Sequence, residues 1–142
     1  MLTVAEPAVG GPASILLVED DETLAGILQR HLRALGYDVL VAETAEAALE
    51  ALRDGLRPRL ILLDINLPGE TGWAVARSPL LAGAGNPAVV IASAVAVDPA
   101  RLRELHIAGY LPKPFALETL VNVVERLTSD AAQSTAESLE QS

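Results

Sequence analysis

Residues 60–64 read Leu-Ile-Leu-Leu-Asp, a run of four apolar residues that ends on a carboxylate. Similar runs end on charged residues at 15–21, Ile-Leu-Leu-Val-Glu-Asp-Asp, and at 109–114, Gly-Tyr-Leu-Pro-Lys-Pro. Short apolar runs of this kind are typical of buried strands. Parallel strands carry their last residues to the same edge of a sheet, where ligands bind. We therefore expect one crevice to hold four charged side chains, those of Glu19, Asp20, Asp64 and Lys113.

The composition fits one domain with a substantial apolar core. The chain has 142 residues, 51% of them hydrophobic, and a net charge of −9. That charge argues against non-specific binding to nucleic acid or to an anionic membrane, because both need basic patches. The absence of cysteine excludes disulfides and thiolate metal sites. With no basic leader and no apolar run of membrane-spanning length, we expect a cytoplasmic protein.

Strand-like and helix-like segments alternate along the chain. Strands are expected at 14–18, 37–41, 60–63, 88–92 and 107–111. Helices are expected at 24–35, from a cap at Thr44 to Gly55, at 71–81, from a cap at Asp98 to 106, and at 117–127. Five such repeats predict an α/β fold of three layers, a (βα)5 doubly wound parallel sheet with right-handed crossovers.

The two ends of the chain differ from this pattern. Residues 1–13 contain two prolines and two glycines and are interpreted as a flexible leader. The domain is assigned to residues 14–128. Residues 129–142 are rich in Ser, Ala, Gln and Glu, which predicts a disordered tail.

The acidic side chains at the expected sheet edge suit a metal ion. Carboxylates that lie this close repel one another unless a cation compensates them. Magnesium prefers oxygen ligands and usually keeps several waters. Asp20 and Asp64 are the expected direct ligands, with the backbone carbonyl of Asn66, while Glu19 acts through water. A simpler alternative stays open, because acids at strand ends often cap the following helix.

Two further polar residues follow predicted strands. Lys113 is the single lysine of the chain, and its ammonium can pair with a carboxylate or a phosphoryl oxygen. Ser93 can donate its hydroxyl to an anion in the same crevice. The alternatives are a solvated surface lysine and a simple capping serine. The peptide bond between Lys113 and Pro114 is a candidate for the cis form.

Four fragments in this order resemble the receiver domain of bacterial two-component response regulators. They read Leu-Leu-Val-Glu-Asp-Asp-Glu at 16–22, Leu-Leu-Asp-Ile-Asn-Leu-Pro-Gly at 62–69, Ala-Ser-Ala at 92–94 and Gly-Tyr-Leu-Pro-Lys-Pro-Phe at 109–115. The likeness runs from about residue 14 to residue 127. It implies a flavodoxin-like sheet with strand order 2-1-3-4-5.

The resemblance also implies a role for each polar residue of the crevice. Asp64 would be the phosphoacceptor, with Lys113 binding the phosphoryl group. Ser93 would be the switch hydroxyl and Tyr110 the switch aromatic. Magnesium would be held by Glu19, Asp20, Asp64 and the Asn66 carbonyl.

The implied activity is transfer of a phosphoryl group to the chain itself. The donor would be a phosphohistidine on a sensor histidine kinase or a histidine phosphotransfer protein. Phosphorylation would then change the face made by the fourth helix, the fifth strand and the fifth helix, which a downstream protein reads. The chain would catalyse only its own phosphorylation and dephosphorylation, as a monomer or a phosphorylation-dependent dimer, without binding nucleic acid or membrane.

The sequence departs from the family pattern at several points, two of which bear on the switch. Serine stands at 93, where threonine is commoner, and the stretch between Ala94 and Lys113 is about two residues short, which predicts a short or shifted fourth helix.

Three alternatives stay open: a receiver-like interaction module that no longer cycles phosphate, a receiver fragment of a larger regulator or hybrid kinase, and a phosphatase of the haloacid dehalogenase type. The phosphatase class needs a second aspartate where this chain has Asn66.

Overall fold

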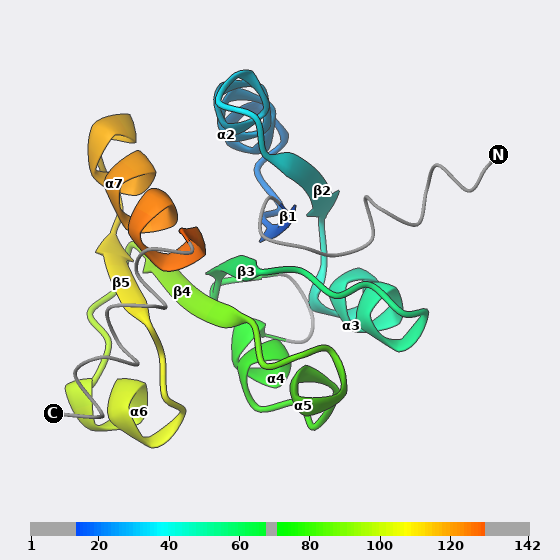
Figure 1. The fold of residues 1–142 in the computed structure, drawn as a ribbon. Coiled ribbons are helices and arrows are strands. Elements are labelled where there is room, and N and C mark those ends of the chain that lie inside the picture. Colours follow the sequence, from blue (N-terminus) through cyan, green and yellow to red (C-terminus); the bar gives the residue numbers. More distant parts are fainter. Residues whose placement is uncertain (1–13, 68–70, 130–142) are drawn as a thin grey trace, which may run out of the picture.

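A parallel five-stranded sheet forms the centre of the protein, with helices on both faces (Figure 1). The computed structural model describes residues 14–67 and 71–129. The strand order is β2-β1-β3-β4-β5, so the predicted fold class and strand order are confirmed. The strands are β1 (Ser14–Val18), β2 (Asp38–Ala42), β3 (Leu60–Asp64), β4 (Ala88–Ser93) and β5 (Gly109–Pro112).

The apolar runs that predicted the strands occupy the middle of the sheet. All five residues of β1 and all five of β3 are buried. By contrast, β2 lies at one edge, where Asp38 and Leu40 are exposed and Val41 is half-buried. A strand covered on both faces has no need for polar residues on either face, which explains the continuous apolar pattern of β1 and β3.

Alternate residues of the strands contribute to two separate cores. Leu16 and Val18 pack with α3 (Ala45–Arg53), α4 (Gly72–Ala76), α5 (Leu80–Gly83) and α6 (Pro99–Glu104) on one face. Ile15 and Leu17 pack with α2 (Glu22–Ala34) and α7 (Leu117–Thr128) on the other. Figure 1 shows these two groups of helices on opposite sides of the sheet.

The predicted helix caps at Thr44 and Asp98 are confirmed. The Thr44 hydroxyl accepts a hydrogen bond from Ala47 N–H at 3.0 Å, and the Asp98 carboxylate accepts one from Ala100 N–H at 2.9 Å. Gly36 follows α2 with φ of 101°, a left-handed conformation that favours glycine. As predicted, α6 is short, with six residues.

The prediction of one helix over residues 71–81 is wrong. The structure has two short helices instead, α4 and α5, separated at Ser78 and Pro79. Proline has no N–H to donate, and its ring disfavours helical backbone at the residue before it. The Ser78 hydroxyl accepts a hydrogen bond at 3.1 Å from the N–H of Leu80, the first residue of the second helix.

Strands β2 and β5 begin later than predicted, for the same physical reason. The N–H of Tyr37 donates to Leu32 O at 3.1 Å, and the N–H of Ile107 donates to Leu102 O at 2.9 Å. Both residues therefore belong to the turn that ends the preceding helix. The strands start at Asp38 and Gly109.

The expected leader, 1–13, and nearly all of the expected tail, 130–142, lie outside the described residues. Within 14–67 and 71–129, no helix is both long enough and apolar enough to cross a membrane.

Replacing Leu16 with alanine should destabilise the protein strongly. Leu16 is fully buried, whereas its register partner in β2, Leu40, is 47% exposed. We expect Leu16→Ala to lower the free energy of unfolding by about 2–5 kcal/mol, because it leaves a cavity in the core. The matched Leu40→Ala should cost less than about 1 kcal/mol. Urea denaturation measures both, and equal losses would contradict the two-sided burial of β1.

Candidate functional site

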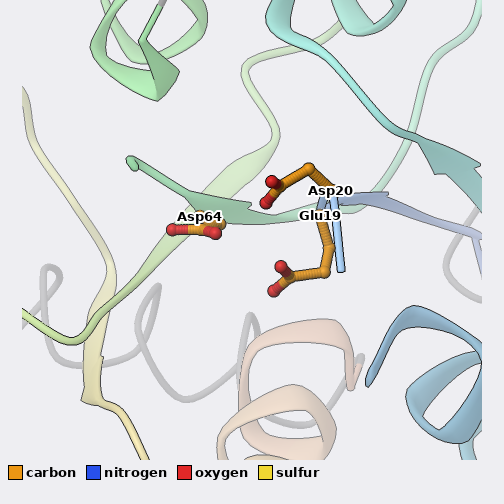
Figure 2. Close-up of side chains that lie close together, drawn as sticks. All are labelled: Glu19, Asp20 and Asp64. Carbon is orange, nitrogen blue, oxygen red and sulfur yellow. The ribbon is translucent and has the colours of Figure 1, made fainter. Parts of the chain in front are cut away.

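Three carboxylates lie together at the carboxyl edge of the sheet (Figure 2). Glu19, Asp20 and Asp64 each contribute one oxygen to a cluster whose oxygens all lie within 4.8 Å of one another. Glu19 and Asp64 are buried, while Asp20 is exposed to solvent. The expected convergence of these side chains is present in the structure.

The parallel register of β1 and β3 produces this convergence. Val18 pairs with Leu63, so the next residue of each segment, Glu19 and Asp64, reaches the sheet edge at the same level. The N–H of Glu19 donates to Ala42 O at 3.0 Å, which continues the β1–β2 pairing beyond the strand and fixes the direction of the chain. The two acids are thus placed by backbone pairing.

Lys113 extends to the same cluster from the end of β5. Its Nζ lies 2.7 Å from Glu19 Oε1 and 3.3 Å from Asp64 Oδ2. The N–H of Lys113 donates to Ser93 O at 2.8 Å, which places the residue beside the end of β4. The Lys113–Pro114 peptide bond is cis, as the sequence suggested. The solvated-lysine alternative is therefore wrong, because the ammonium pairs with two buried carboxylates.

Burial and pairing shift the ionisation of this pair. Burial raises the pKa of the Glu19 carboxyl above its ordinary range, although hydrogen bonds from Lys113 and from Asp21 N–H act in the opposite direction. Burial acts to lower the pKa of Lys113, but the hydrogen bond to Glu19 and the charges of Glu19 and Asp64 outweigh it, so that pKa is raised. Lys113 is thus a cation at neutral pH. Its single positive charge cannot balance three ionised carboxylates, so the cluster needs further positive charge.

The donor set fits a hard divalent cation. All three side chains offer carboxylate oxygens, which are the ligands that magnesium prefers. The exposure of Asp20 leaves a solvent-facing side, where water can complete the coordination. The N–H of Asn66 donates to Asp64 Oδ1 at 2.9 Å, so Asn66 lies against the same carboxylate. A ligand role for the Asn66 carbonyl stays a prediction.

Ser93 is buried and bonded to its own loop. Its Oγ donates to Val95 O at 2.8 Å and accepts hydrogen bonds from Val95 N–H at 3.0 Å and Asn66 Nδ2 at 3.3 Å. Tyr110 is half-buried, and its hydroxyl donates to Val95 O at 3.4 Å. The two expected switch residues therefore meet at one shared acceptor, the Val95 carbonyl.

Gly72 belongs to the site, although it was not among the residues predicted for it. A Cβ atom added at Gly72 would lie 2.5 Å from Asp64 O and 2.7 Å from Ile65 Cα. The first turn of α4 therefore approaches the backbone that carries Asp64 too closely for any side chain. The only available signal was a glycine at the expected start of a helix, where glycine is a poor helix former.

A family model describes most of this chain. Residues 15–125 match the model for the response regulator receiver domain. The DNA-binding response regulator MtrA of Mycobacterium tuberculosis is 42% identical over 108 residues, which cover 75% of this chain and 46% of that protein. The response regulator MprA of Mycobacterium sp. is 35% identical over 112 residues, covering 78% of this chain and 48% of that protein. The chain spans about half the length of these curated relatives.

Solved structures of similar proteins agree with this match. The non-phosphorylated HemR receiver domain from Leptospira biflexa is 34% identical with a TM-score of 0.72, and the match covers 82% of this chain and 94% of that one. The response regulator TrrA from Thermotoga maritima, solved with Mg(2+)-BeF, is 27% identical with a TM-score of 0.69, and the match covers 80% and 97%.

Replacing Gly72 with alanine should disturb the Asp64 backbone. The added methyl group overlaps main-chain atoms that cannot move without displacing β3. We expect the free energy of unfolding to fall by about 1–3 kcal/mol. Gly83→Ala is the matched control, because a Cβ atom there meets nothing within 4 Å. Urea denaturation tests the pair, and a Gly72→Ala protein as stable as the control would contradict the close approach.

Replacing Asp20 with asparagine should weaken Mg²⁺ binding without destabilising the fold. We expect Mg²⁺ to raise the melting temperature of the wild-type protein, because binding to the native state stabilises it. Asp20→Asn should melt higher than wild type without metal, since one repulsive charge is gone, and should respond to Mg²⁺ much less. Glu22→Gln makes the same charge change outside the cluster and should respond to Mg²⁺ like wild type. An undiminished Mg²⁺ response in Asp20→Asn would refute the assignment.

Proposed function

The chain belongs to the response regulator receiver domain family, and from that premise we propose that Asp64 accepts a phosphoryl group from a phosphohistidine on a partner protein. The observation that carries the proposal is the contact of 3.3 Å between Asp64 Oδ2 and Lys113 Nζ within the carboxylate cluster. It unites a nucleophile, a fixed cation and a set of oxygen donors at one sheet edge.

The geometry holds Asp64 in one orientation for attack. The N–H of Asn66 donates to Oδ1 and the ammonium of Lys113 to Oδ2, so both carboxylate oxygens have a partner. In the transfer, an Asp64 oxygen forms a bond to phosphorus while the bond from phosphorus to the imidazole nitrogen breaks. The imidazole keeps the electron pair. Positioning of this kind supplies much of the rate in phosphoryl transfer.

Charge stabilisation comes from Lys113 and from the metal site. The ammonium is compact and hydrogen-bonds readily to a phosphoryl oxygen. When bound, magnesium would offset the negative charge of the transferring phosphoryl group. Glu19, Asp20 and Asp64, with the Asn66 carbonyl, are the residues proposed to hold it. The burial of Glu19 and Asp64 keeps bulk water away, which makes each of these charges more effective.

The proposed signal passes through the Val95 carbonyl. A phosphoryl group on Asp64 adds about 1.5 to 2 negative charges and new acceptor oxygens. The Ser93 hydroxyl would turn from Val95 O to one of these oxygens. Tyr110, which donates to the same carbonyl, would then rearrange with the loop. The face made by α6, β5 and α7 changes in consequence, and a downstream protein reads it.

An apolar groove beside Lys113 supports docking of the phosphohistidine protein. The groove has a volume of about 330 Å³. Ile27, which lines it, is 40% exposed, so the groove presents apolar surface to solvent. A sensor histidine kinase or a histidine phosphotransfer protein seated there would place its phosphohistidine next to the Asp64 site. Six apolar residues of α2, of α7 and of the segment before α7 line the groove: Leu24, Ile27, Leu28, Pro114, Phe115 and Leu117.

A second candidate is that the chain acts as the receiver part of a longer regulator. The observation that favours it is coverage, because the matches span only 46–48% of the curated relatives.

The DNA binding named for MtrA belongs to that protein. For this chain, with a net charge of −9, we propose protein partners and a cytoplasmic location, without direct binding of nucleic acid. Its chemistry is proposed to be limited to its own phosphorylation and dephosphorylation.

Incubation with Mg²⁺ and acetyl phosphate tests the proposed acceptor. Intact mass should show one added phosphoryl group on the wild-type protein. Asp64→Asn should abolish the addition, because the amide is a poor nucleophile, whereas Asp38→Asn, on the exposed edge of β2, should leave it unchanged. Retention of the added group in Asp64→Asn would contradict the proposal. Repeated hydrolysis of a phosphate ester without a protein adduct would favour the phosphatase alternative.

A further inference from the structure

A second pocket, unlike the apolar groove, opens where β3 and β4 end. It has a volume of about 290 Å³ and lies between α4 and α6, lined in part by Asn66, Ser93, Trp73 and Arg101. Asn66 connects it to the acceptor, because its N–H donates to Asp64 Oδ1 and its side chain donates to Ser93 Oγ. The pocket is therefore one hydrogen bond away from the carboxylate that takes the phosphoryl group.

Arg101 and Trp73 both line this pocket and contact each other. The guanidinium carbon lies 4.9 Å from the centroid of the indole ring, which is the geometry of a cation–π contact. Such a contact holds the guanidinium in place while its in-plane N–H groups stay suited to a carboxylate. Asp98 also lines the pocket, but its carboxylate caps α6 by accepting the Ala100 N–H.

The charges around Asp64 differ from one side to another. Glu19 and Asp20 make one side anionic, and this side repels a negatively charged leaving group. The pocket offers Arg101 in contrast, whose positive charge offsets the negative charge of the Asp98 carboxylate, together with the apolar surface of the Trp73 ring. Its volume of about 290 Å³ lies just below the range for drug-sized ligands, about 300–1,000 Å³, so it suits a small molecule.

We propose that the pocket walled by Trp73 and Arg101 receives the carboxylate leaving group of small acyl phosphates, which makes Arg101 a specificity-determining residue for phosphorylation by free donors. The inference rests on the proposed function of Asp64 as the acceptor. An Asp64 oxygen bonds to phosphorus, and the bond between phosphorus and the acyl oxygen breaks. The carboxylate leaves with the electron pair, and no proton, oxidant or reductant takes part.

Arg101 favours this step more than it favours donor binding. The acyl oxygen gains negative charge as its bond to phosphorus breaks, so a nearby guanidinium stabilises the transition state more than the bound donor. A donor whose leaving group carries no carboxylate gains nothing from the pocket. Phosphoramidate is such a donor, because its leaving group is ammonia.

The test compares the rates at which two donors, acetyl phosphate and phosphoramidate, phosphorylate variants of Arg101 and Arg103. With acetyl phosphate and Mg²⁺, Arg101→Gln should lower the rate of phosphorylation per donor concentration about two- to fivefold, as expected for loss of an exposed ion pair. With phosphoramidate the rates of variant and wild type should agree. Arg103→Gln removes the same charge from the same helix, outside the residues that line the pocket, and should match wild type with both donors. Arg101→Lys should recover part of the lost rate.

The remaining outcomes each overturn the inference. An equal loss with both donors would show that Arg101 supports the position of α6 or the Asp64 site in general, and no loss with either donor would show that the pocket takes no part. If wild-type protein is phosphorylated by neither donor, the proposed function of Asp64 fails and the subsite fails with it. Phosphorylation of the wild type by phosphoramidate alone would refute the subsite and leave the proposed acceptor standing.

Discussion

The ammonium group of Lys113 pairs with two buried carboxylates that lie at the ends of different strands, and the rest of the site depends on this pairing. Glu19 is only 3% exposed and Asp64 only 5% exposed, and such acids are costly to bury without a partner. The pairing joins the ends of β1, β3 and β5, with β4 held between them through the bond from Lys113 N–H to Ser93 O. One cation for three acids still leaves an excess of negative charge, which explains why the site suits a divalent ion.

The segment after β4 connects this charged centre to the surface. Ser93 holds the loop through both the N–H and the carbonyl of Val95, and Tyr110 bonds to the same carbonyl from β5. A few residues further on, α6 carries Arg101 to its contact with Trp73. A change of charge at Asp64 therefore has one proposed route outward, through Val95 to Tyr110. The pocket at Arg101 is the proposed site for the leaving group, and the short helix α6 borders it.

The sequence predicted those parts of the fold that local chemistry decides. The apolar runs of β1, β3 and β4 and the caps at Thr44 and Asp98 needed no tertiary information, whereas the strand order came from the family resemblance. Features that depend on contacts between distant segments or on backbone detail could not be predicted from the sequence. Tyr37 and Ile107 look like strand residues but complete helix-ending turns. The close approach of Gly72 to the Asp64 backbone and the Arg101–Trp73 contact arise only when separate elements pack together.

A crystal structure of the protein grown with Mg²⁺ and beryllofluoride tests the central pairing most directly, because beryllofluoride mimics a phosphoryl group on an aspartate. We expect beryllofluoride to be bound to Asp64, with Lys113 Nζ and the Ser93 hydroxyl donating hydrogen bonds to its fluorides. A metal ion should lie among the carboxylates of Glu19, Asp20 and Asp64. An unmodified Asp64 at saturating beryllofluoride, or a modified Asp64 with Lys113 turned away into solvent, would contradict the account.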